Sequence, residues 1–206
     1  MKKLVNIVVI LVFVALNSCI IVKNDTIEEE SQQIVNLSPK PLVQMSDEIV
    51  RSKDGDMIAF LPLDWFFVNV EDKASANIFS VAVNPDYTLA AVFSRMPLTP
   101  EGAEIVKREG VIGLSRLFFE KHSSKTGGAA KQLGTTTKIN MGPLEFGKYI
   151  YSTAGGANKC RAAVFQSSIG NYYEFALVQM DFRAKPLPTQ DEVEKIFLSV
   201  VSTIQY

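Results

Sequence analysis

The chain has 206 residues, of which 47% are hydrophobic, and its formal net charge at pH 7 is −1. This length and composition suit one domain that builds its own hydrophobic core. The near-neutral charge excludes the basic surface by which proteins bind DNA or RNA, so we expect no nucleic-acid partner.

The chain begins with a pattern typical of a secretory signal. Lys2 and Lys3 precede a run of 13 residues, from 4 to 16, in which Asn6 is the only polar side chain. A basic start followed by an apolar run of this length predicts export. One alternative is an uncleaved membrane helix over residues 4–22, although a span needs roughly 20 apolar residues. The other is ordinary secretion without a lipid.

The apolar run ends in Leu-Asn-Ser-Cys at residues 16–19, which resembles the lipobox of bacterial lipoproteins. The resemblance implies that residues 1–18 are a lipoprotein signal peptide and that Cys19 carries acyl groups such as palmitate. Two or three acyl chains hold a protein durably on a membrane, whereas one holds it only marginally. We therefore expect a lipid-anchored protein of the bacterial cell envelope, outside the cytoplasm, and on the outer membrane if the host has one. With Cys19 lipidated, Cys160 has no partner for a disulfide.

Residues 19–47 are predicted to be a flexible tether between the lipid and the domain. Residues 24–33 are polar and acidic, and two prolines follow them. Such a stretch has little to bury, and the prolines block regular hydrogen bonding. The alternative is that the short apolar runs at residues 34–37 or 42–43 pack on the domain as an edge strand, because runs of this length are ambiguous.

Residues 48–206 are predicted to form a single globular domain, whose first half alternates apolar runs with turn signals. Lys53, Asp54 and Gly55 mark a hairpin turn. Asn-Pro-Asp at residues 84–86 marks a second turn. The strands expected around these turns cover residues 48–51, 57–62, 78–83 and 89–96.

One helix is expected in the middle of the domain. Thr99 followed by Pro100 is typical of a helix start, and Gly127 with Gly128 is typical of a helix end. Apolar residues between these signals fall roughly on one face. Two internal glycines would either weaken the helix or allow it to approach a sheet closely.

The remaining strands are expected at residues 133–141, 144–153, 159–168 and 172–182. The short gaps between them favour antiparallel neighbours, since parallel strands need long crossovers. Thr189 and Glu192 form the capping box of a last helix, with apolar residues at helical spacing up to Ile204. This order predicts an α+β fold, with a mostly antiparallel sheet covered by helices.

The domain resembles the Mog1/PsbP-like family in the order of its elements and in four short motifs. They are Phe-Leu-Pro-Leu-Asp-Trp at residues 60–65 after Gly55, the helix after Thr99-Pro100, Tyr-Tyr-Glu-Phe at residues 172–175, and the closing helix over residues 197–204. The resemblance covers about residues 48–206 and implies an α/β/α sandwich that acts as a binding or assembly module, not as an enzyme. It carries over no catalytic residue, and fold likeness alone does not license a function.

Cys160 with His122 is the only thiol–imidazole pair that the chain could offer a catalyst once Cys19 is lipidated. A nucleophilic cysteine needs a base within hydrogen-bond reach, and no family signature surrounds either residue. A small buried hydrophobe is therefore the favoured role of Cys160. An envelope enzyme of the hydrolase type, with a dispersed active site, is the alternative to a binding module.

No metal or cofactor is expected. One histidine and one available cysteine cannot supply a typical zinc site. The acidic run Glu28–Glu30 is expected to be solvated and not to bind calcium. The glycine pairs at residues 127–128 and 155–156 fit no phosphate loop, so we expect them to end a helix and to join two strands.

Consecutive aromatic residues are the remaining lead. Trp65, Phe66 and Phe67 cannot all face one side of a strand, and neither can Tyr172 and Tyr173. Burial on both faces by helices is the favoured explanation, and an exposed binding surface is the alternative. The chain is thus predicted to be a lipid-anchored binding module that presents a sheet edge or an aromatic-lined pocket to a protein partner or an apolar ligand.

Overall fold

The structure is a computed structural model that describes residues 34–70, 75–153, 156, 158–181 and 185–206. All of these residues belong to one compact unit of the chain, Gln32–Tyr206. The expected signal peptide, Cys19 and the first part of the expected tether lie outside the described residues. Among the described residues, no helix is long and apolar enough to cross a membrane.

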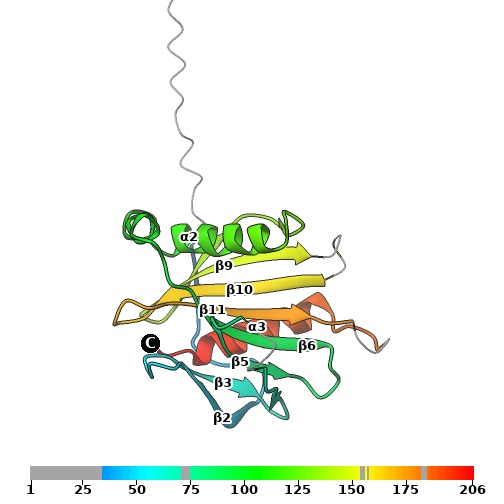
Figure 1. The fold of residues 1–206 in the computed structure, drawn as a ribbon. Helices are drawn as coiled ribbons and strands as arrows, with labels where there is room; N and C mark the ends of the chain where they lie inside the picture. Colours follow the sequence, from blue (N-terminus) through cyan, green and yellow to red (C-terminus); the bar gives the residue numbers. More distant parts are fainter. Residues whose placement is uncertain (1–33, 71–74, 154–155, 157, 182–184) are drawn as a thin grey trace, which may run out of the picture. The chain divides into compact units, whose positions relative to one another are not determined.

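A nine-stranded sheet forms the centre of this unit (Figure 1). Its strand order is β1-β8-β9-β10-β11-β6-β5-β4, and β7 pairs with β9 outside this path. The strands are β1 (Ile34–Leu37), β4 (Phe66–Phe67), β5 (Ile78–Val83), β6 (Leu89–Arg95), β7 (Lys131–Gln132), β8 (Thr137–Met141), β9 (Leu144–Thr153), β10 (Asn158–Gln166) and β11 (Tyr172–Gln179). The separate hairpin sheet is β2 (Met45–Arg51) with β3 (Ile58–Pro62), and the helices are α2 (Pro100–Lys125) and α3 (Gln190–Thr203).

All neighbouring strands of the large sheet are antiparallel except β1 and β8. This confirms the predicted α+β class. The predicted turns are also present. Gly55 has a φ of 76° in the β2–β3 turn, a conformation that favours glycine. In the β5–β6 turn, the Asn84 carboxamide oxygen accepts hydrogen bonds from the backbone N–H groups of Thr88 and Leu89 at 2.8 and 2.9 Å.

Helix α2 covers one face of the sheet (Figure 1). Alternate residues of β9 and β10 face it, because side chains along a strand point to opposite faces. At Gly147 the helix comes so close that a Cβ atom would collide with Ser115 and with the Val111 carbonyl oxygen. The buried residues of this face are Met96, Val106, Leu114, Phe118, Ala130, Tyr149, Tyr151, Cys160, Ala162 and Val164.

Helix α2 consists of two segments that run in different directions (Figure 1). The change occurs at Gly110, whose φ of 60° and ψ of −145° are not helical. The predicted helix is present, and the bend at Gly110 is a feature that the sequence analysis did not predict. The bend folds the first segment back, so that a Cβ atom on Gly113 would lie 2.8 Å from the Glu109 Cβ atom. Gly113 thus permits a close approach within α2, whereas Gly147 permits the approach to the sheet.

Helix α3 and the β2–β3 hairpin cover the opposite face of the sheet. The predicted capping box is present: the Thr189 hydroxyl accepts from Glu192 N at 3.3 Å, and the Glu192 carboxylate accepts from Thr189 N at 2.8 Å. Phe197 of α3 stacks on Phe175 of β11 with ring centroids 5.5 Å apart. The larger of the two cores of the domain therefore lies between α3, the hairpin and the sheet.

Residues 34–47 are not a free tether, and that part of the prediction was wrong. Strand β1 pairs in parallel with β8, with Val35 opposite Ile139. Further along, the backbone N–H groups of Leu42 and Val43 donate to the Ser199 hydroxyl at 2.8 and 3.1 Å. The edge-strand alternative at residues 34–37 is correct, since β1 pairs with β8. By doing so, β1 covers the edge that β8 would otherwise leave open.

Candidate functional site

The three consecutive aromatic residues have different environments at the β4 edge of the sheet. Trp65 is 6% exposed and belongs to the core beneath α3. Phe66 and Phe67 form β4 itself and are 37% and 45% exposed. The favoured explanation, burial on both faces by helices, is therefore wrong for β4, and the exposed alternative fits Phe66 and Phe67.

Among the residues that the structure describes, no strand pairs with the outer edge of β4. Phe66 lies opposite Val83 and Phe67 opposite Ala82 on β5, and Val68 N donates to the Val81 carbonyl oxygen at 2.9 Å. Antiparallel pairs alternate between hydrogen-bonded and non-hydrogen-bonded. Since the Val68 pair is bonded, the N–H and C=O of Phe67 point away from β5, where the strand order of the described residues ends.

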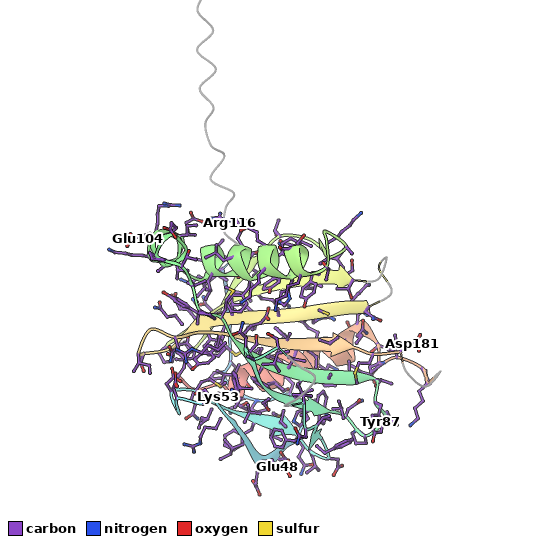
Figure 2. All side chains as sticks on the ribbon, viewed as in Figure 1. Glu48, Lys53, Tyr87, Glu104, Arg116 and Asp181 are labelled. Atoms are coloured by element: carbon purple, nitrogen blue, oxygen red, sulfur yellow. The ribbon has the colours of Figure 1, made fainter. Side chains whose placement is uncertain are left out.

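Four exposed apolar side chains surround this edge, and we call them the β4 patch: Leu63, Phe66, Phe67 and Val68. Phe66 makes an edge-to-face contact with Tyr87 at a centroid distance of 5.5 Å, which fixes its orientation. Figure 2 shows Tyr87 at the end of the sheet where β5 and β6 turn, away from Glu104 on α2. Exposed apolar side chains gathered in this way are typical of interaction sites.

A groove of about 620 Å³ continues the β4 patch along β5. Phe67, Val68, Ile78 and Phe79 give it apolar walls, and Lys53 adds a positive charge. A second hollow of about 240 Å³ shares Lys53 and Phe79 with the groove. The surface beside the edge strand is therefore apolar with a basic rim, which suits an extended segment that carries apolar and acidic side chains.

A hydrogen-bond network holds the hairpin turn that carries Lys53. The Asp56 carboxylate accepts from the hydroxyls of Ser52 at 2.7 Å and Tyr173 at 2.6 Å, and from Ser167 and Asn171. Partial burial alone would raise the pKa of Asp56, but these four hydrogen bonds hold that pKa well below its usual value. The network therefore fixes the turn against β11 and keeps the rim of the groove in place.

The proposed thiol–imidazole pair does not form a catalytic dyad. His122 Nε2 lies 2.9 and 3.0 Å from the two carboxylate oxygens of Glu174, and the imidazole ring stacks on Tyr151. Cys160 lies opposite Tyr151 in the β9–β10 pair, and burial raises the pKa of its thiol to about 11. A thiol held neutral in this way is a poor nucleophile, so the predicted role of Cys160 as a buried hydrophobe fits its position.

The other candidates lie away from the β4 patch. Tyr173 is buried and bonds Asp56, and Tyr172 packs in the core beneath α2. Gly127 and Gly128 have positive φ values and bond Ser124 and Ser123 carbonyls, which fits their predicted helix-ending role. Within the described ranges, no cluster of three or more His, Cys, Asp or Glu side chains could hold a metal.

Two solved structures have the same arrangement of elements. Cyanobacterial PsbP (CyanoP) from Synechocystis sp. PCC 6803 matches with a TM-score of 0.53 and 16% identity, over 77% of this chain and 92% of that one. The Ran-binding protein Mog1p of Saccharomyces cerevisiae matches with a TM-score of 0.51 and 9% identity, over 79% and 96%. The domain has the Mog1/PsbP-like fold. No family model matches the chain, and no curated protein matches it.

The predicted Mog1/PsbP-like fold is thus confirmed, while sequence reasoning missed the buried polar clusters around Asp56 and Glu174. Glu174 is 4% exposed and receives a hydrogen bond from the Tyr149 hydroxyl in addition to the His122 contacts. The Mog1/PsbP-like motif around residue 174 contains this glutamate, but the motif gave no signal that it bonds a helix 52 residues away.

Proposed function

We propose that this protein is a non-catalytic binding or assembly module, anchored by lipid in the bacterial cell envelope, that takes up an extended segment of a protein partner at β4. The observation that carries the proposal is the position of the Phe67 N–H and C=O within the exposed β4 patch: they point away from β5 toward an edge with which no other described strand pairs. An edge strand with free N–H and C=O groups pairs readily with another chain, and proteins usually cover or charge such an edge. Here the edge is apolar instead.

Strand addition would use the backbone and the groove together. The partner's main chain would hydrogen-bond Phe67, and its alternate side chains would enter the groove that Phe67 and Phe79 line. An acidic side chain on the partner would meet Lys53 at the rim. These features select an extended apolar segment with one or more carboxylates.

The fold neighbours add limited support for a binding role. Mog1p is described as a Ran-binding protein, and a fold of this kind hosts more than one function. The alternative, a hydrolase-type enzyme, has less support, because burial raises the pKa of the Cys160 thiol and the His122 imidazole nitrogen bonds Glu174.

The anchor follows from the lipobox-like ending at Cys19. Strand β1 begins at Ile34, so the proposed tether shortens to about residues 19–33. If those residues act as a flexible coil, their r.m.s. reach is about 20 Å, which keeps the domain close to the membrane. Labelling with a radioactive fatty acid tests the anchor: the Cys19→Ser variant should lose the label, and unchanged labelling would contradict lipidation.

A photo-crosslinking amino acid at position 67, in the full chain in its native membranes, tests the β4 site. We expect one defined partner band from position 67 and none from position 104, which Figure 2 shows on α2. The Leu63→Ser/Val68→Ser variant should lose the band, whereas Ile169→Ser should keep it, because Ile169 is 66% exposed but lies in the β10–β11 turn. Equal bands from positions 67 and 104 would contradict the site, and a dimer band would identify a second copy of this chain as the occupant.

A further inference from the structure

Another cavity, separate from the groove and the hollow beside β4, lies on the face of the sheet that α2 covers. It has a volume of about 110 Å³ and is lined by the last turns of α2, the strands β6 and β11, and the start of β5. A cavity of about 150 Å³ in another protein holds benzene. The size of this one therefore suits a ligand with about four to six non-hydrogen atoms.

The floor of the cavity is apolar. Val92 on β6 and Ala176 and Val178 on β11 point to the same face of the sheet, since they alternate with residues of the core beneath α3. Phe118 of α2 and Met96 close the sides. An apolar body of a few carbon atoms would lose water on entering this space and gain contacts.

The one carboxylate in the lining is already satisfied. Glu174 accepts from the Tyr149 hydroxyl and contacts His122 Nε2 through both oxygens, and the Ser94 hydroxyl donates at 3.4 Å. When Glu174 is ionised it has no proton to donate, so His122 Nε2 is the donor in this pair. The carboxylate oxygens of Glu174 thus have hydrogen-bond partners inside the wall and are not offered to a ligand.

The basic side chains in the lining differ from one another in whether they form an ion pair. Arg95 pairs with Asp54 at 2.6 Å, but among the described residues Lys121 and Lys125 form no ion pair. Burial, together with the neighbouring charge of Lys125, lowers the pKa of Lys121, and the charge of Glu174 acts in the opposite direction without cancelling this shift. An anion between these two ammonium groups would relieve their repulsion.

We infer that this cavity binds a small carboxylate with an apolar body of about three to four carbon atoms, with Lys121 and Lys125 at the carboxylate and the floor of β6 and β11 around the carbons. The inference does not use β4: the proposed ligand contacts Lys121 and Lys125 of α2 and the floor formed by β6 and β11. A cationic ligand fits less well, since Glu174 is occupied by its own donors. A neutral apolar ligand would fill the floor but make no ionic contact with the two lysines.

The test is a titration of the full chain, purified in detergent, with four probes: butyrate, butylammonium, 1-butanol and inorganic phosphate. Methyl groups of Met and Ala, labelled for NMR, report the site, because Met96 and Ala176 line the cavity and Ala59 lies in the other core. We expect butyrate to shift Met96 and Ala176 saturably, with a Kd on the order of 1 mM, and to leave Ala59 unchanged. The other three probes should bind at least about tenfold more weakly.

Two sets of variants separate charge from shape. Lys121→Gln/Lys125→Gln should weaken butyrate binding about tenfold, whereas the matched control Lys107→Gln/Lys195→Gln should not, because both of those lysines are exposed and outside the cavity. Ala176→Leu should abolish the Met96 shift by filling the floor. The inference is overturned by equal binding of butanol, by tighter binding of butylammonium, by phosphate matching butyrate, or by no shift with any probe up to about 50 mM.

Discussion

The Tyr173 hydroxyl donates a 2.6 Å hydrogen bond to Asp56 and so joins β11 of the large sheet to the β2–β3 hairpin turn. These residues are 117 positions apart in the chain. Their bond is part of the network that holds Lys53 at the rim of the groove. Loss of the Asp56 charge should therefore affect both the stability of the hairpin and the shape of the proposed binding surface.

Asp56→Asn should lower the free energy of unfolding at pH 7 by about 1–3 kcal/mol, because hydrogen bonds to a charged group are lost. The folded-state pKa of Asp56 lies below its unfolded value of about 3.9. Its stabilisation is therefore complete above the unfolded pKa and is lost as the pH falls toward the folded pKa. Urea unfolding at about pH 7, 5 and 3 should show the same gap in stability between the two proteins at pH 7 and 5 and a smaller gap at pH 3. The exposed Asp47→Asn control should match the parent protein at every pH, and a constant gap for Asp56→Asn would contradict this explanation.

Gly147→Ala should destabilise the domain by about 1–3 kcal/mol, because the new methyl group meets Ser115 and the backbone of Val111. Gly102→Ala is the matched control. A Cβ atom at Gly102 would make only ordinary contacts with Leu98, at 3.5 Å, and alanine is the better helix former. Thermal unfolding should give a lower Tm for Gly147→Ala than for the parent protein, and an equal or higher Tm for Gly102→Ala. An unchanged Tm for Gly147→Ala would show that α2 packs less closely on β9.

Cys160 should react slowly with iodoacetamide in the folded protein and quickly in urea. Burial raises the pKa of the thiol to about 11, so it remains neutral at pH 8. Because the Cys160 pKa is higher in the folded state, the contribution of the neutral thiol to stability is fully present below the unfolded-state pKa. It is lost as the pH rises through the folded-state pKa of about 11. Peptide mass spectrometry gives the rate at this residue, and equal rates in the folded and unfolded states would reopen the question of a reactive thiol.

Truncation of the neighbouring aromatic residues should change the free energy of unfolding by very different amounts. Trp65→Ala should cost about 3–5 kcal/mol, since the ring is in the core. Phe66→Ser/Phe67→Ser should change the free energy of unfolding by less than about 1 kcal/mol, because both rings are exposed. Denaturant titrations measure both values. A loss of several kcal/mol in the double variant would indicate that β4 is structural and would weaken the proposal of a binding edge.

Much of the fold could be predicted because its signals are local. The turn at Gly55 and the capping box of Thr189 with Glu192 each depend on residues within four positions of one another. The bend at Gly110 could not be predicted, since glycine is compatible with both a continuous and a broken helix until packing decides. Strand β1 is short, and its pairing depends on β8, about 100 residues later in the chain.

The candidate site was only partly predictable, because its contacts join residues that lie far apart in the chain. Alternation along a strand required that Trp65 and Phe66 face different sides, but only the sheet order places β4 at the edge. The contact between His122 and Glu174 joins a helix to a strand, with no pattern in the sequence to pair them. Cys160 was correctly predicted to be a buried side chain because free cysteine is usually buried.

The most direct measurement is hydrogen–deuterium exchange at the Phe67 amide, in the purified protein and in the complex trapped by crosslinking at position 63. The Phe67 N–H points away from β5, so it should exchange freely in the protein alone. If a partner strand adds to β4, this amide should become protected by at least about a hundredfold in the complex, while the Val68 amide, already bonded to Val81, changes little. A complex in which Phe67 still exchanges freely would contradict strand addition at this edge.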